Sequence, residues 1–170
     1  IDCIWNGMTA TDELKNQINF SSAYMNNSQV AVIRKADAAK YKDLASMSGA
    51  KVVAEAGSAG EIAVKADAGL SKSYLPVKDQ GTSLMEVKSK TADIAIIDAA
   101  GSIGEGTDYD DLMIVDVISS ADSEVYAVGI RKSDTELTAK INAAIKELYD
   151  DGTLAKLAEK YNLSGRVIAQ

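Results

Sequence analysis

Residues 52–64, VVAEAGSAGEIAV, carry the pattern that decides the fold class. A short apolar run rich in β-branched residues leads through Gly57-Ser58-Ala59-Gly60 into a segment with helical spacing. A strand that passes through such a turn into a helix is the repeating unit of α/β proteins. Because the same alternation recurs along the chain, the sequence predicts an α/β fold.

Along the rest of the chain, short apolar runs alternate with longer helical segments. Most of the runs are continuously apolar, which is typical of strands in sheets covered on both faces. The expected strands are 1–5, 29–33, 50–54, 94–97, 112–117 and 125–130. The expected helices are 12–17, 40–46, 60–68, 83–90, 135–150 and 153–161. Gly152 predicts a stop between the last two helices, and Pro76 is expected in a turn.

Composition excludes several classes of function. The 170 residues carry a formal charge of −7, which disfavours binding to a phosphate backbone, so no nucleic-acid partner is expected. The chain has no histidine and one cysteine, Cys3, so the usual zinc sites, nucleophile pairs and internal disulfides are unavailable. No metal, cofactor or catalytic residue is predicted.

No apolar run approaches the roughly 20 residues of a membrane helix, and no leader is recognised, so a soluble mature form is expected.

Two junctions between a strand and a helix could bind an anion. In WNGMTATDE, Gly7 permits close backbone approach, and Thr11 is a candidate N-cap before an acidic first turn. The alternative is a plain capped turn. In the loop 57–60, the N–H groups and the Ser58 hydroxyl are expected to face outward at a positive helix end. This loop is too short for a Walker A motif, and it lacks dinucleotide-binding spacing.

A third junction, ADIAIIDAAGS, places Asp98 at the carboxyl end of a buried strand. Ligands of open α/β sheets usually bind at this edge. A carboxylate there could take an ammonium group, or it could cap a following helix. The residues alone leave these two readings equal.

Four segments in order resemble the extracellular solute-binding proteins of ABC transporters, specifically the polar amino-acid family. They are IDCIWNGMTATDELKNQINFSSAYM, VVAEAGSAGE, ADIAIIDAAGS and DDGTLAKLAEKYNL, and the resemblance covers essentially the whole chain. It implies a type II periplasmic-binding-protein-like α/β fold, with two lobes of open sheets joined by two crossing strands and a ligand cleft between them. Residues 1–27 would form part of lobe one, 28–118 lobe two, and 119–170 the return crossing and the rest of lobe one.

The resemblance also implies a set of ligand-binding residues. Gly7 and Thr9, with neighbouring Asn6, would contact the ligand, the Ser58-Ala59-Gly60 loop would receive its carboxylate, and Asp98 would pair with its α-ammonium. Leu14 stands where the family has an arginine that binds the ligand carboxylate. Ala59 replaces a hydroxyl residue that commonly binds the same carboxylate. Both changes remove anion contacts, so common free α-amino acids are expected to bind weakly or not at all, and the expected ligand is an amino-acid-like solute or an amine.

The family begins with about two further strand–helix units, so lobe one is incomplete and is expected to expose apolar surface or strand edges. Self-association or domain swapping of a homo-oligomer would cover them, with hinges at 25–28 and 119–124. The predicted function is delivery of a small polar solute to an ABC permease in the periplasm or outside the cell, as a membrane-anchored lipoprotein in a Gram-positive source. The alternatives are a truncated or engineered scaffold without ligand, and a dehydratase using Asp98, Glu55 or Glu61.

Overall fold

The computed structural model describes residues 1–99, 103, 108–118, 124–161 and 163–170. The chain divides into two units. Unit 1 consists of Ile1–Asn27 and Asp122–Gln170, and unit 2 consists of Ser28–Ala121. The chain passes from unit 1 to unit 2 at Ser28, within the expected crossing 25–28. Most of the expected return crossing, residues 119–123, lies outside the described part of the chain.

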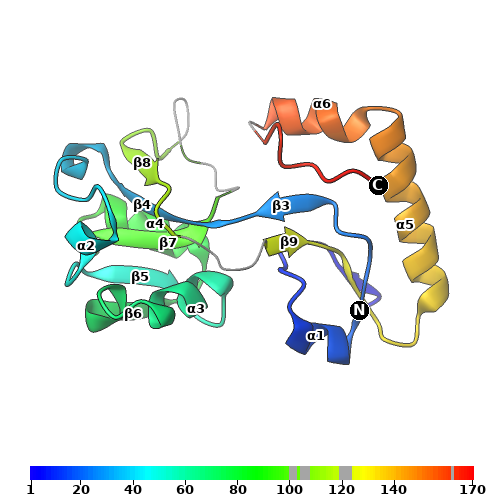
Figure 1. Cartoon of the computed structure of the whole chain (residues 1–170), viewed down its shortest axis with the longest axis horizontal. Coiled ribbons are helices and arrows are strands. Elements are labelled where there is room, and N and C mark those ends of the chain that lie inside the picture. Colours follow the sequence, from blue (N-terminus) through cyan, green and yellow to red (C-terminus); the bar gives the residue numbers. More distant parts are fainter. Residues whose placement is uncertain (100–102, 104–107, 119–123, 162) are drawn as a thin grey trace. The chain divides into compact units, whose positions relative to one another are not determined.

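Unit 2 is built around a five-stranded mixed sheet with the order β6-β5-β7-β4-β8 (Figure 1). Its strands are β4 (Gln29–Arg34), β5 (Val52–Glu55), β6 (Tyr74–Val77), β7 (Ile94–Asp98) and β8 (Leu112–Val115). β5 runs parallel to β6 and β7, whereas β4 is antiparallel to β7 and β8. The carboxyl ends of β5 and β7 therefore lie at the same edge of the sheet as the start of β4.

Helices cover both faces of this sheet, as the apolar runs predict. On one face, Ile33, Val52, Ile94 and Ile96 pack with residues of α2 (Leu44–Met47), α3 (Ala59–Ala66) and the 3-10 turn η2 (Leu70–Ser73). On the other face, strand residues such as Val32, Val53, Ala95 and Ile97 pack with Leu84 and Val87 of α4 (Gln80–Lys88). Burial of each large aliphatic side chain contributes about 1.5–3 kcal/mol, so these two layers hold unit 2 together.

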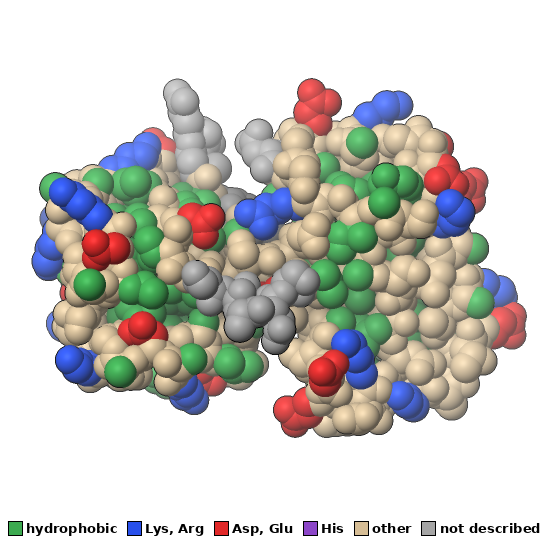
Figure 2. Space-filling model, viewed as in Figure 1, with side chains coloured by type: hydrophobic (Ala, Val, Ile, Leu, Met, Phe, Trp, Pro, Cys, Tyr) green, Lys and Arg blue, Asp and Glu red, His purple; other side chains and the backbone are tan. Residues whose placement is uncertain are grey.

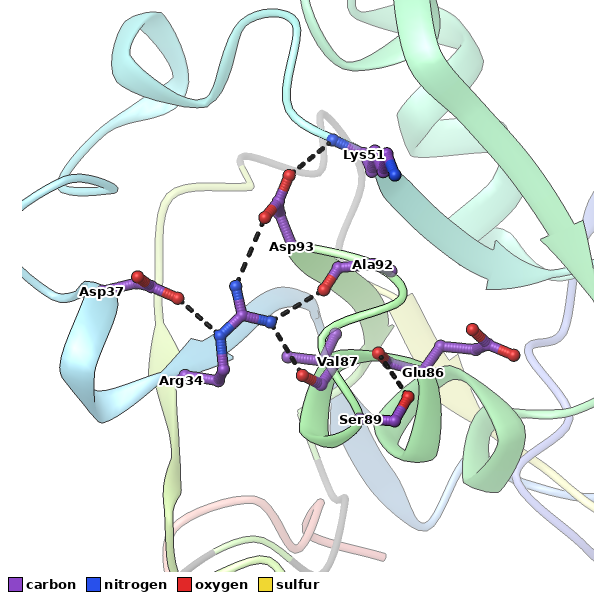
Figure 3. Close-up of polar contacts among 8 residues, drawn as sticks. All are labelled: Arg34, Asp37, Lys51, Glu86, Val87, Ser89, Ala92 and Asp93. Carbon is purple, nitrogen blue, oxygen red and sulfur yellow. Dashed lines mark hydrogen bonds and ion pairs between the residues drawn. The ribbon is translucent and has the colours of Figure 1, made fainter.

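Arg34, at the end of β4, joins several segments of unit 2 through one guanidinium group (Figure 3). Its Nε donates to Asp37 at 2.6 Å, in the 3-10 turn η1 (Lys35–Asp37), and one terminal nitrogen donates to the carbonyls of Val87 and Ala92, each at 2.8 Å. The other terminal nitrogen of Arg34 lies 3.3 Å from Oδ1 of Asp93. The Arg34 side chain is only 13% exposed, so these bonds form where water competes weakly.

The described residues of unit 1 form two small antiparallel sheets and three helices. One sheet has the order β1 (Cys3–Ile4), β10 (Gly129–Ile130), β2 (Asn19–Phe20), and the other pairs β3 (Met25–Asn27) with β9 (Glu124–Tyr126). The helices are α1 (Asp12–Gln17), α5 (Thr135–Asp150) and α6 (Thr153–Lys160). Val128 and Ile130 pack on Ile145 of α5 to form the core of this unit. Gly152 adopts φ +79° between α5 and α6, the left-handed conformation expected of a helix stop.

Several boundaries differ from the sequence prediction for local physical reasons. The expected strand 125–130 is two strands, because β9 pairs with β3 whereas β10 pairs with β1 and β2. α4 begins three residues earlier than expected because the Asp79 carboxylate caps it. Strands β2 and β3 were not expected, since neither carries an apolar run.

The prediction of a turn at Pro76 is wrong. Pro76 lies in β6, opposite Ala54 of β5. Because β6 is at the edge of the sheet, the missing N–H of proline breaks no ladder bond, and its presence discourages the pairing of another strand there.

Figure 2 shows one face of the molecule. On this face, Lys and Arg side chains are dispersed among acidic ones around each unit, and hydrophobic side chains are visible between them. The cations on this face form no continuous basic surface.

Candidate functional site

Asp98 ends β7 at the carboxyl edge of the unit 2 sheet, and two glutamine side chains hold its carboxylate. Gln29, directly opposite Asp98 in the β4–β7 register, donates from Nε2 to Oδ1 at 2.7 Å. Gln80, the first residue of α4, donates from Nε2 to Oδ2 at 2.6 Å. The backbone N–H of Asp98 donates back to Oε1 of Gln80 at 3.3 Å. The carboxylate therefore has a defined orientation.

The Asp98 carboxylate has the chemistry to bind a cation. An ionised carboxylate offers about four lone-pair positions on its two oxygens. The Asp98 side chain is partly exposed. This arrangement suits an ammonium or guanidinium group, which makes short, charge-assisted bonds to a carboxylate.

The loop before α3 presents backbone donors. Ser58 is the N-cap, since its hydroxyl accepts from the N–H of Glu61 at 3.1 Å and donates to the carbonyl of Glu55 at 2.7 Å. The expectation that this hydroxyl faces outward is therefore wrong, because it satisfies the turn itself. Within the part of the chain that the structure describes, the N–H groups of Ala59 and Gly60 donate no hydrogen bond. They are two of the donors that the start of a helix offers to an anion.

Gly60 brings this loop against the Asp98 network. A Cβ added at Gly60 would lie 2.9 Å from the carbonyl oxygen of Ile96 and 3.0 Å from Oε1 of Gln29. Only glycine fits there without displacing its neighbours. Gln29 thus places its oxygen beside Gly60 and bonds to Asp98 through its nitrogen.

The Glu61 carboxylate also stabilises this loop through its polar contacts. It accepts from Lys65 at 2.8 Å, from the N–H of Gly57 at 2.8 Å and from the Tyr74 hydroxyl at 3.0 Å. The bond to Lys65, followed by those from Gly57 and Tyr74, lowers the pKa of Glu61 to about 2. Burial and the nearby Glu61 carboxylate raise the pKa of Tyr74 to about 12. At neutral pH Glu61 is therefore a charged anchor, with no proton to give to a substrate.

The remaining predicted site residues lie in unit 1. Asn6 and Gly7 are exposed beyond β1, which ends at Ile4 and not at Trp5 as expected. The Asn6 carbonyl accepts from the Tyr24 hydroxyl at 3.4 Å, and Thr9 pairs with Tyr126. Leu14 is partly buried in α1.

The predicted N-cap at Thr11 is confirmed. Its hydroxyl accepts from the N–H of Leu14 at 3.3 Å. The junction after β1 is therefore a capped turn, which matches one of the two readings of this stretch. The other reading, an anion site, stays a prediction.

The structure brings four of the eight predicted residues into one neighbourhood of unit 2, namely Ser58, Ala59, Gly60 and Asp98. The link between them is Gln29, which the sequence reasoning missed together with Gln80. One signal was present, because Gln29 is a polar residue at the start of an otherwise apolar strand. Its partner could not be found without the strand register.

A comparison with protein families identifies the family of this chain. Residues 1–164 match the model of the bacterial extracellular solute-binding proteins, family 3. The chain belongs to this family. Its type II periplasmic-binding-protein-like α/β fold, expected from the resemblance, is confirmed.

Individual family 3 relatives agree with this assignment. The arginine-binding extracellular protein ArtP of Bacillus subtilis is 33% identical over 168 residues, which are 95% of this chain and 63% of ArtP. An amino acid ABC transporter substrate-binding protein from Streptococcus pneumoniae, solved bound to L-arginine, matches with a TM-score of 0.84 and 27% identity, covering 99% of this chain and 69% of that one.

A second similar structure is an ancestral amino acid-binding protein described as a precursor of cyclohexadienyl dehydratase. Its TM-score is 0.82 at 29% identity, and the match covers 95% of this chain and 69% of that chain. The chain spans about three fifths of the length of the curated relatives that it matches.

Two features are absent from the described residues. None of the helices there has the length and apolarity needed to cross a bilayer. The same residues contain no cluster of three or more His, Cys, Asp or Glu side chains suited to a metal ion.

Proposed function

We propose that this family 3 chain binds a small solute with a positively charged amino group and delivers it to an ABC transporter permease. The observation that carries the proposal is the Asp98 carboxylate, oriented by Gln29 and Gln80 at the carboxyl edge of the unit 2 sheet. Such an acceptor offers a cation a fixed, charge-assisted partner. ArtP is named as arginine-binding, which makes L-arginine the first solute to test.

The anionic end of an amino-acid ligand would meet fewer donors than is usual in the family. The N–H groups of Ala59 and Gly60 are available at the start of α3, but Leu14 and Ala59 provide no side-chain donor. The positive charge of the ligand therefore supplies most of the recognition. We expect agmatine, which is arginine without its carboxylate, to bind within about tenfold of L-arginine. Asn6, Gly7, Thr9 and Leu14 are proposed contacts of the same solute on the family resemblance alone.

A catalytic role is less well supported. One similar structure is described as a precursor of a dehydratase, and such an enzyme needs an acid to protonate a leaving group. Two of the three acids considered, Glu61 and Asp98, fit this role poorly. Glu61 is ionised at neutral pH and bonded to Gly57, Lys65 and Tyr74. Asp98 is held by two amide donors. We therefore propose a binding protein and not an enzyme.

Location and assembly follow from the same proposal. The family consists of extracellular proteins, so we place this chain in the periplasm or outside the cell, where a lipid anchor would keep it near its permease.

Ile1, Ile4 and Trp5 of unit 1 are 95%, 40% and 58% exposed. We propose that a second copy covers this apolar surface, by domain swapping or simple association. Sedimentation at micromolar concentration should show a dimer, and a single monomeric species would contradict it.

The binding proposal is tested by replacing Asp98 with asparagine. Loss of a charge-assisted bond costs about 1.5–3 kcal/mol, so Asp98→Asn should weaken L-arginine and agmatine binding by about 10- to 150-fold in calorimetry. Asp110→Asn, an exposed change in the same unit, is the matched control and should leave the affinity unchanged. Unchanged affinity in Asp98→Asn would remove Asp98 from the site. Failure of the unmodified chain to bind either cation would overturn the proposed solute class.

A further inference from the structure

We infer that Gln29 and Gln80 are positioning residues, which set the orientation in which Asp98 receives the cationic group of the solute. This inference rests on the proposed function. The two amides approach the carboxylate from different elements, since Gln29 is on β4 and Gln80 is at the start of α4. Each occupies a different oxygen of Asp98, so rotation of the carboxylate breaks at least one bond.

The burial of Gln29 argues that it does more than fill space. Its exposed fraction is 1%, and the strand residues that follow it, Val30, Ala31, Val32 and Ile33, form the apolar core. Burying a polar amide among such residues is unfavourable unless its atoms are hydrogen-bonded. An apolar side chain would fill the same volume without that requirement. The position instead has an amide whose Nε2 bonds to Asp98.

The orientation of the Gln80 amide follows from its partners. The backbone N–H of Asp98 can only donate, so the Gln80 oxygen faces it at 3.3 Å. The Gln80 nitrogen is then directed at Oδ2, at 2.6 Å. This pair of bonds fixes Gln80 relative to both the backbone and the side chain of Asp98.

Gln29 also connects Asp98 to the loop at the start of α3. Its Oε1 lies where a Cβ at Gly60 would be only 3.0 Å away. A movement of Gln29 therefore disturbs both the cation acceptor and the loop with the free N–H groups. Preorganised acceptors bind more tightly because their ordering does not have to occur on binding. Loss of either glutamine should accordingly weaken the cation without removing the charge of Asp98.

A double-mutant cycle tests this inference. Gln29→Met and Gln80→Met, which keep the approximate length of the side chain, should each weaken L-arginine binding by about 5- to 20-fold in calorimetry. In an Asp98→Asn background the same changes should weaken it less than twofold further, because the carboxylate that they orient is gone. Equal effects in the two backgrounds would overturn the inference. Gln17→Met, on the exposed surface of α1, is the control and should have no effect.

A second measurement needs no ligand and separates this inference from the proposed function. The side-chain NH₂ signals of Gln29 and Gln80 in NMR spectra should shift on Asp98→Asn, because their acceptor changes from a charged to a neutral group. The NH₂ signals of Gln17 should stay in place. Shifted signals with no binding of L-arginine would support the geometry and reject the solute. Unshifted Gln29 and Gln80 signals would reject the positioning role, whatever the protein binds.

Discussion

Replacing Arg34 by methionine should lower the free energy of unfolding by about 2–4 kcal/mol, the largest effect that we expect from a change outside the candidate site. The guanidinium bonds to Asp37, Asp93 and the carbonyls of Val87 and Ala92 (Figure 3). Methionine would remove the guanidinium bonds in a place where water enters poorly, although Asp93 and the Val87 carbonyl keep bonds from the backbone N–H groups of Lys51 and Lys90. Removing one partner of a buried ion pair typically costs about 3–5 kcal/mol, and the 27–29% exposure of the two aspartates reduces this figure.

Chemical denaturation of Arg34→Met measures the loss, and two other variants make it specific. Arg131 also pairs with two aspartates, Asp2 and Asp134, but its side chain is 54% exposed, so Arg131→Met should cost less than about 1 kcal/mol. Arg34→Lys keeps the charge but loses the planar fork, and should fall between the two. Equal stability of Arg34→Met and Arg131→Met would show that the Arg34 bonds add nothing beyond an exposed pair.

Gly60→Ala should lower the free energy of unfolding by about 1–3 kcal/mol and should also impair solute binding. The new Cβ would lie 2.9 Å from the Ile96 carbonyl, which belongs to the central strand β7 and cannot move easily, and 3.0 Å from the Gln29 oxygen. Because Gly60 is in α3, alanine should otherwise favour the helix by about 0.5–1 kcal/mol. A net loss would therefore reflect steric conflict with β7 and Gln29.

Gly81 provides the matched control for this change. It is also near the start of a helix, α4, but the nearest atom to an added Cβ is an Asp79 oxygen at 3.5 Å. Gly81→Ala should therefore leave the stability unchanged or raise it slightly in the same denaturation experiment. If Gly60→Ala behaved like Gly81→Ala, the close approach of the α3 loop to Gln29 would not constrain the sequence.

The architecture was largely predictable because its signals are local. α1 and α5 have the expected bounds, 12–17 and 135–150, since each has a capping side chain and helical spacing. The buried strands β4, β5 and β7 were found from their apolar runs. β2 and β3 were missed, because two- and three-residue strands are stabilised by their distant partners and carry no pattern of their own.

The candidate site was only partly predictable for the same reason. Asp98 was found because it follows a buried strand, and the α3 loop because of its glycines. Gln29 and Gln80 are 69 and 18 residues away from Asp98 in the chain. Only the antiparallel register of β4 and β7 and the start of α4 bring them together. The Ser58 hydroxyl was misplaced because both a cap and a ligand contact fit the same residue type.

The discontinuous make-up of unit 1 has a consequence for the order of events during synthesis. β1 pairs with β10 through Cys3 and Ile130, so the ribosome must make the whole of unit 2 before that pair can form. Unit 2 is one continuous segment, and domains generally fold as units while the chain emerges. Its sheet can therefore form while residues 1–27 still await their partners. Closing so long a loop is entropically costly, and a prefolded unit 2 shortens the flexible chain that remains to be ordered.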